Sequence, residues 1–245
     1  MVTEIEGVEG AVLANVRSHL SLVQAETLDD ISVWRARQMA SDAREEISLA
    51  LEPFGFYRPV IEVRLSEPEN DQMPWRASVN IQPGEPVTIG RLDLLVTGAG
   101  ADHPDLVEWK REWPLDEGKV LNHAVWETAW RRAVKIAADL GYFEHQFIKR
   151  QVEVDRSRNL ANVELHLDTG PRFRFSGYSA EPIAFTDRLL DRLTIIEDDE
   201  PYSRQRVDEQ REVLTRAGLF DRIVVEQQRD GDEDTINLHY RLEAR

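Results

Sequence analysis

Along the chain, segments whose apolar residues recur at helical spacing are interspersed with segments that have the apolar pattern of strands. The middle third shows this most clearly. Residues 122–140 place apolar side chains at three- to four-residue spacing, which indicates one buried face of a helix. Residues 102–113 show a shorter stretch of the same spacing. Residues 87–96, 147–155 and 159–167 read as strands, the last two joined as a hairpin. The predicted order is β-α-α-β-β.

The same order is predicted twice more along the chain. The first part carries strands at 3–8, 59–65 and 75–82, a helix with Val12, Val16, Leu20 and Val23 on its apolar face, and a helix from Ser32. The last part carries strands at 172–177, 222–228 and 235–242 and helices at 186–193 and 203–217. The chain is therefore predicted to be an α+β protein of three tandem repeats, at 1–82, 83–168 and 169–245.

A glycine followed by two large apolar side chains comes after the second helix of each repeat. The three phrases are Gly55-Phe56-Tyr57, Gly141-Tyr142-Phe143 and Gly218-Leu219-Phe220. Glycine adopts positive φ at little cost, so each glycine is predicted to end a helix. The side chains after it are then expected to fold back onto the core.

Other local signals refine these boundaries. Ser32, Asn122 and Ser203 are predicted helix N-caps. Pro53 denies the helix from Ser32 a hydrogen bond in its last turn, so that helix is expected to kink or end near residues 50–51. The borders at 83–86 and 169–171 are tight Pro/Gly turns, which predicts a semi-rigid curved rod rather than loosely tethered domains.

Composition narrows the possible partners. The chain has 30 basic and 46 acidic residues, a net charge of −16, which disfavours binding to nucleic acid and to anionic lipid surfaces. It has no cysteine, which excludes disulfides and thiolate chemistry. No apolar run has the length of a membrane helix, and no signal peptide opens the chain. This pattern suits either a cytoplasmic protein or a mature or excised fragment.

Candidate chemistry is weak throughout, so neither an enzyme, nor a cofactor, nor a metal site is predicted. The six histidines lack metal-ligand spacing, and no dinucleotide, phosphate-loop or nucleophile motif is present. The acidic stretches 198–200 and 230–234 read as a solvated loop and a hairpin turn rather than calcium loops. Four tryptophans at helical spacing are interpreted as core residues: Trp109, Trp113, Trp126 and Trp130.

The repeated β-α-α-β-β order, the phrase at 141–143 and the entry Thr169-Gly170-Pro171-Arg172-Phe173-Arg174-Phe175 resemble POTRA (polypeptide-transport-associated) domains. These are periplasmic repeats that precede the outer-membrane barrel of Gram-negative assembly and secretion proteins. Three repeats, with the stretches 8–16 and 54–62, look most like the N-terminal periplasmic region of TamA, the barrel subunit of the translocation and assembly module. BamA-type proteins usually carry five repeats and two-partner secretion transporters two.

The resemblance implies that each repeat is a three-stranded mixed sheet covered on one face by two helices. It also implies a docking arm on the periplasmic face of the outer membrane, whose barrel is absent from this chain. The implied partners are a TamB-like inner-membrane-anchored periplasmic protein and unfolded outer-membrane protein clients, bound by strand addition at sheet edges.

The first strand of the closing hairpin lies at an edge in this family. The expected edges are 60–64, 147–154 and 223–227. The first is assigned to the partner and the third to the barrel, through Val60, Ile61, Glu62, Val63 and Arg64 and through Ile223, Val224 and Val225.

Two alternatives stay open on the sequence. One keeps the fold but changes the pathway, as the POTRA arm of a BamA-type or two-partner secretion transporter or of a division protein. The other is a soluble repeat-built binding protein with no membrane role.

Overall fold

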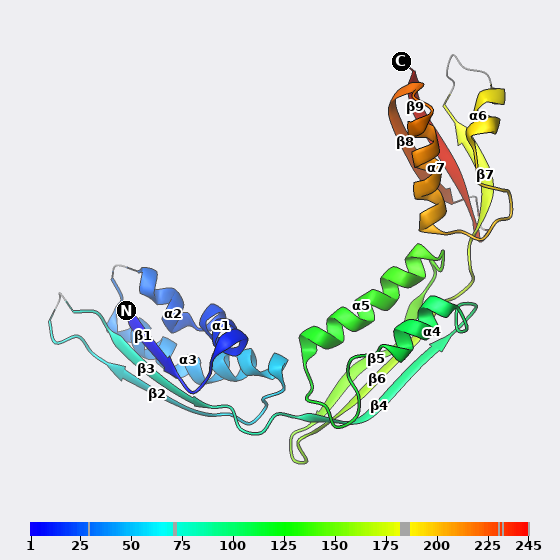
Figure 1. Ribbon diagram of the computed structural model, residues 1–245. Helices are drawn as coiled ribbons and strands as arrows, with labels where there is room; N and C mark the ends of the chain where they lie inside the picture. The colour runs from blue at the N-terminus through cyan, green and yellow to red at the C-terminus, as the bar shows by residue number, and fades with distance from the viewer. Residues whose placement is uncertain (29, 71–72, 182–186, 230, 232, 245) are drawn as a thin grey trace. The chain divides into compact units, whose positions relative to one another are not determined.

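The computed structural model describes residues 1–28, 30–70, 73–181, 187–229, 231 and 233–244 (Figure 1). Three positions used in the sequence predictions, Thr186, Asp230 and Asp232, lie outside the described residues. No helix in the described ranges is both long and apolar enough to cross a membrane.

The described elements follow the predicted order. The first repeat has β1 (Val2–Glu6), α1 (Gly10–His19), α2 (Ser21–Gln24), η1 (Ala25–Thr27), α3 (Val33–Leu51), η2 (Glu52–Phe54), β2 (Val60–Ser66) and β3 (Arg76–Gln82). The second has β4 (Thr88–Thr97), α4 (Pro104–Arg111), α5 (His123–Asp139), β5 (Gln146–Asp155) and β6 (Leu160–Asp168). The third has β7 (Arg174–Ala180), α6 (Asp187–Leu193), α7 (Arg204–Arg216), β8 (Phe220–Arg229) and β9 (Thr235–Ala244).

Each repeat forms its own three-stranded sheet with the last strand in the centre. The strand orders are β1-β3-β2, β4-β6-β5 and β7-β9-β8. In the first and third sheets the central strand pairs in parallel with the first strand and antiparallel with the second. Helices cover one face of each sheet in Figure 1. The predicted α+β fold of mixed sheets is confirmed, and each sheet has its first and second strands as edges.

The first repeat shows why these residues form these elements. Along β3, Ala77, Val79 and Ile81 are buried while the residues between them are exposed, which is the two-residue alternation of a half-covered sheet. On α3, Ala43 and Ile47 are buried one helical turn apart and face the same core.

The predicted helix boundaries hold at the caps. The side chains of Ser32 and Ser203 accept the backbone N–H of Arg35 and Arg206 at 3.3 and 3.2 Å. Asn122 accepts the N–H groups of the two residues after His123 in the same way. α3 ends at Leu51 and the chain continues as the short helix η2, which holds Pro53, as the missing donor of proline predicts.

Three predictions need correction. The helix expected around Val12–Val23 is divided, because Leu20 is extended (φ −82°, ψ 116°) and separates α1 from α2. The strand expected to end at Gly177 continues to Ala180, and Gly177 (φ +89°) lies at a register shift inside it. Trp130 is only half-buried, whereas Trp109, Trp113 and Trp126 are core residues as predicted.

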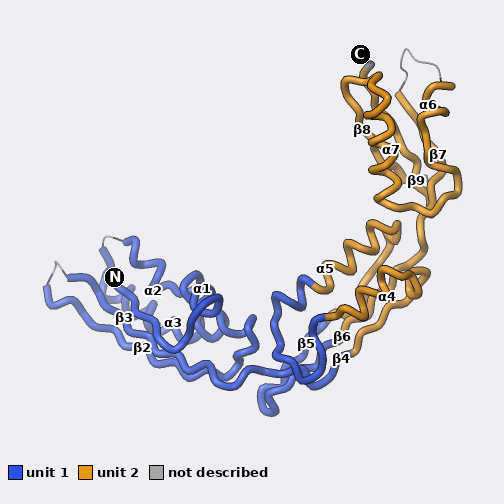
Figure 2. The backbone as a smooth tube through the Cα atoms, in the orientation of Figure 1, with its two compact units in different colours: residues 1–92, 114–128, 151–163 blue, residues 93–113, 129–150, 164–245 orange. Residues whose placement is uncertain are grey.

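The chain divides into two compact units that do not follow the repeat borders (Figure 2). One contains residues 1–92, 114–128 and 151–163, and the other contains residues 93–113, 129–150 and 164–245. Each unit therefore includes one border between consecutive repeats together with the residues on both sides of it. The borders at 82/83 and 168/169 remain an interpretation of the sequence pattern.

Candidate protein-binding sheet edges

One hydrogen bond shows which way the backbone N–H and C=O groups of the first sheet point. The Val2 N–H donates to the Trp75 carbonyl at 2.8 Å, so the odd-numbered residues of β3 point their backbone groups toward β1. The even-numbered residues then point toward β2, where Ser78 lies opposite Arg64 and Asn80 opposite Glu62. The even-numbered residues of β2 therefore form the backbone hydrogen bonds with β3.

The remaining residues of β2 present their backbone to the outer edge. Ile61, Val63 and Leu65 direct N–H and C=O groups away from β3, while their half-buried side chains pack against the core of the repeat. Val60 lies on the other face of the sheet and is 58% exposed. The predicted partner-binding range 60–64 thus has two outward backbone positions, Ile61 and Val63, between three that pair with β3.

The opposite edge of the same sheet is closed by its own chain. The Thr3 N–H, which points away from β3, donates to a Glu26 carboxylate oxygen at 2.9 Å. The Thr3 hydroxyl donates to the Leu22 carbonyl at 3.2 Å, and Thr3 itself is buried. Helix α2 and the turn η1 therefore cover β1, and β2 is the accessible edge of the first sheet.

The first strands of the other two sheets are covered in a related way. Ile89 of β4 donates to the Lys119 carbonyl and accepts from Gly118, at 2.8 and 2.7 Å. Phe175 of β7 donates to the Glu200 carbonyl and accepts from Asp199, both at 2.8 Å. In all three repeats, a segment between the first strand and the hairpin occupies the first strand's outer edge.

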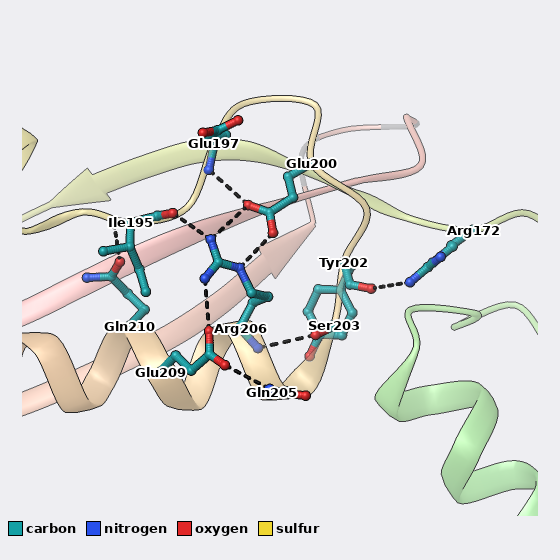
Figure 3. Close-up of polar contacts among 10 residues, drawn as sticks. All are labelled: Arg172, Ile195, Glu197, Glu200, Tyr202, Ser203, Gln205, Arg206, Glu209 and Gln210. Atoms are coloured by element: carbon teal, nitrogen blue, oxygen red, sulfur yellow. Dashed lines mark hydrogen bonds and ion pairs between the residues drawn. The ribbon is translucent and has the colours of Figure 1, made fainter. Parts of the chain in front are cut away.

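Arg206 anchors the covering segment of the third repeat (Figure 3). Its guanidinium donates to Glu200 at 2.7 Å, to Glu209 at 2.8 Å and to the Ile195 carbonyl at 2.7 Å. The Arg206 hydrogen bond is the main cause that lowers the pKa of Glu200, and the same carboxylate interactions raise the pKa of Arg206. Beside it, the buried Gln210 accepts the Ile195 N–H at 2.7 Å.

The predicted barrel-proximal edge has the same backbone arrangement as β2. The Glu181 N–H donates to the Tyr240 carbonyl at 3.0 Å, so even-numbered residues of β9 face β7. Odd-numbered ones face β8, and Val224 lies opposite Arg241 in that ladder. Ile223 and Val225 consequently direct their backbone groups outward.

The third predicted edge, 147–154 in β5, is less regular. Phe147 packs edge-on against Trp130 of α5 with ring centroids 5.7 Å apart. Arg150 lies over the same ring at 4.4 Å, although residues three apart on a regular strand face opposite ways. The alternation therefore changes phase within β5, and such irregular edges resist the addition of another strand.

The glycine–aromatic phrases contribute to the borders between repeats as well as to helix ends. Gly55 has φ +89°, and its carbonyl accepts the N–H of Val87 at 2.8 Å. A Cβ atom at Gly55 would lie 2.7 Å from the Leu121 carbonyl oxygen. The Tyr57 hydroxyl is 2.6 Å from Nε2 of His123, and burial is the main cause that raises the pKa of Tyr57 to about 12.

The second phrase repeats this arrangement. Gly141 has φ +87°, and its carbonyl accepts the N–H of Phe173 at 2.9 Å. Tyr142 is buried in its own repeat, whereas the Phe143 ring packs on Phe173 and Tyr202 at 5.3 and 4.8 Å. Of the two aromatic residues, only Tyr142 therefore packs in the core of the second repeat.

In the third phrase, both large residues stay in their own repeat. Gly218 has φ +68°, and Leu219 and Phe220 pack in the core of the third repeat. Sequence reasoning missed the border role because the three phrases look alike in the sequence, and the contacted residues lie far along the chain.

Comparison with known families agrees with this architecture. Residues 2–83 match the family model for POTRA domain TamA domain 1, and residues 172–245 match the POTRA model described as surface antigen variable number repeat. The chain belongs to the POTRA-domain family. POTRA domains are scaffold modules in Omp85-family transporters, and membership of this family implies a periplasmic scaffold role in outer-membrane protein assembly or secretion.

Three solved structures are similar to this POTRA chain. POTRA3–5 of Haemophilus influenzae BamA is 12% identical, over 99% of this chain and 94% of that one, with a TM-score of 0.48. POTRA1–3 of Omp85 from Anabaena is 16% identical, over 100% and 93%, with a TM-score of 0.38. CdiB from Escherichia coli is 13% identical, over 98% and 36%, with a TM-score of 0.38.

Proposed function

We propose that this POTRA array is a periplasmic docking arm whose first repeat binds a partner protein by strand addition at β2. The observation that carries the proposal is the difference between the two edges of the first sheet. Thr3 on β1 is satisfied by Glu26, whereas Ile61, Val63 and Leu65 on β2 direct their backbone groups outward. An edge of this kind binds an extended segment through its backbone.

The proposed partner of β2 is a TamB-like periplasmic protein anchored in the inner membrane. The match of residues 2–83 to the first POTRA domain of TamA supports this assignment. Backbone pairing tolerates many sequences, so unfolded outer-membrane protein clients are proposed to use sheet edges of the same type. The third repeat is proposed to contact a C-terminal barrel through Ile223, Val224 and Val225, because the last POTRA repeat precedes the barrel in this family.

A proline at Val63 tests the β2 edge. The Val63 N–H points outward, so Val63→Pro removes one docking hydrogen bond and none from the ladder with β3. Val63→Ala is the matched control, because it removes similar packing and keeps the N–H. We expect Val63→Pro to fold, because an edge strand tolerates proline where its N–H points away from the sheet, and only Val63→Pro to lose binding.

Binding is measured by calorimetric titration with the C-terminal region of a TamB-like protein. Equal affinity of a folded Val63→Pro and of Val63→Ala would show that the partner does not use the β2 edge.

A further inference from the structure

One arginine lies directly on the open edge of the first sheet. Nε of Arg44, on α3, donates to the carbonyl oxygen of Ile61 at 3.3 Å. That carbonyl is one of the outward groups of β2, which a docking strand would need as an acceptor. Arg44 therefore occupies in the free protein a position that the partner must take.

Arg44 differs from the other arginine on this side of α3 in its lack of an acidic partner. Arg37, two helical turns earlier, pairs with Glu67 at 2.6 Å. Within the described residues, Arg44 forms no ion pair, and neither the residues three nor those four positions away on α3 are acidic. In a chain with a net charge of −16, this leaves a cation on the docking edge without a carboxylate.

The residues around Arg44 define the side chains that the partner strand presents. Ala40 and Ser48, four positions before and after Arg44, are small and half-buried, and lie on the same side of α3. Four helical residues span about 6 Å. Two strand residues span about 6.7 Å. Three alternate side chains of a strand added to β2 therefore match the positions of Ala40, Arg44 and Ser48.

We propose that the strand that docks on β2 carries an acidic side chain between two apolar ones at alternate positions. Its backbone N–H takes the Ile61 carbonyl, its carboxylate binds the displaced Arg44 guanidinium, and the flanking apolar side chains lie over Ala40 and Ser48. The inference rests on the proposed docking edge and adds the chemistry of the docking segment. Before docking, Arg44 protects the edge against indiscriminate strand pairing.

Fluorescence anisotropy with labelled peptides tests this selectivity. Three peptides share an alternating Val/Thr sequence and differ only at the central residue, which is Glu, Gln or Lys. The wild-type chain is expected to bind the Glu peptide about fivefold more tightly than the Gln peptide, as for one partly exposed ion pair. Arg44→Ala is expected to abolish that preference and to bind the Gln peptide at least as well as the wild type, because the Ile61 carbonyl is free.

Charge reversal supplies the matched control. Arg44→Glu and Arg35→Glu change the net charge equally, but Arg35 is exposed near the start of α3, nine residues before Arg44 and outside the docking edge. Arg44→Glu is expected to prefer the Lys peptide, and Arg35→Glu to keep the wild-type order. The same order in both variants would overturn the selectivity while leaving the edge intact. No binding of any peptide to the wild type would overturn the docking edge itself.

Discussion

At the scale of single residues, the glycines of the repeated phrases show how the same local sequence acquires different roles. All three have positive φ, so a residue with a side chain would be strained at each of these positions. Their surroundings differ, since a Cβ at Gly141 would lie 2.8 Å from Cβ of Tyr202, whereas at Gly218 it would meet no atom within 4 Å. The positive φ of these glycines could be predicted from the sequence, but the residues that surround each glycine could not.

This difference predicts unequal costs for the same substitution. Gly218→Ala should lower the unfolding free energy by about 1 kcal/mol, the cost of a left-handed alanine. Gly141→Ala should cost about 1–3 kcal/mol more, because the added methyl group overlaps Tyr202. Urea unfolding of the two variants measures both costs. Equal destabilisation would mean that Tyr202 is not held against Gly141.

Arg206 gives a pH-dependent prediction at the same scale. Its hydrogen bond lowers the pKa of Glu200 from the ordinary value of 4.5, so the pair stabilises the fold above that value and the stabilisation is lost as pH falls through the lowered pKa. Arg206→Gln should therefore lose more stability at about pH 7 than at about pH 3. Arg204→Gln, whose ion pair with Asp208 is 3.9 Å long, is the control and should show a smaller pH difference. A loss that is the same at both pH values would contradict the role of the carboxylate.

At the scale of elements, periodicity predicted most of the fold because burial alternates along strands such as β2, β3 and β6 and recurs at helical spacing along α3. The segments that cover the first strands could not be predicted this way. Residues 118–121 and 199–202 are short and aperiodic, and their backbone contacts form only when distant parts of the repeat meet. The family resemblance predicted the candidate edge 60–64. No sequence pattern indicated that Arg44 contacts this edge or that Glu26 contacts the opposite one.

Amide hydrogen exchange tests the two edges of the first sheet directly. Glu62 and Arg64 donate into the ladder with β3, so their amides should exchange more slowly than those of Ile61 and Val63. The Thr3 amide should be protected in the wild type and lose protection in Glu26→Ala, since Glu26 is its acceptor. Uniform protection along β2 would mean that its outer edge is covered in solution.

At the scale of the whole molecule, three repeats offer second-strand edges of unequal quality. β2 and β8 have outward backbone groups at alternate positions, whereas β5 changes phase beside Trp130. The strong negative charge of the chain disfavours nucleic acid and anionic lipid, so specificity must come from local features such as Arg44. These properties support the proposal that the chain recognises extended protein segments at its sheet edges.

The central claim, docking of a partner strand on β2, is tested most directly by disulfide mapping. The chain has no cysteine, so Arg64→Cys gives a single thiol on the exposed face of β2. The C-terminal region of a TamB-like protein is then scanned with single cysteines and cross-linked under mild oxidation. Strand addition predicts cross-links at alternate partner residues, with a period of two. Cross-links with a helical period, or none above the level of an Asp42→Cys control on the helix face, would contradict docking at this edge.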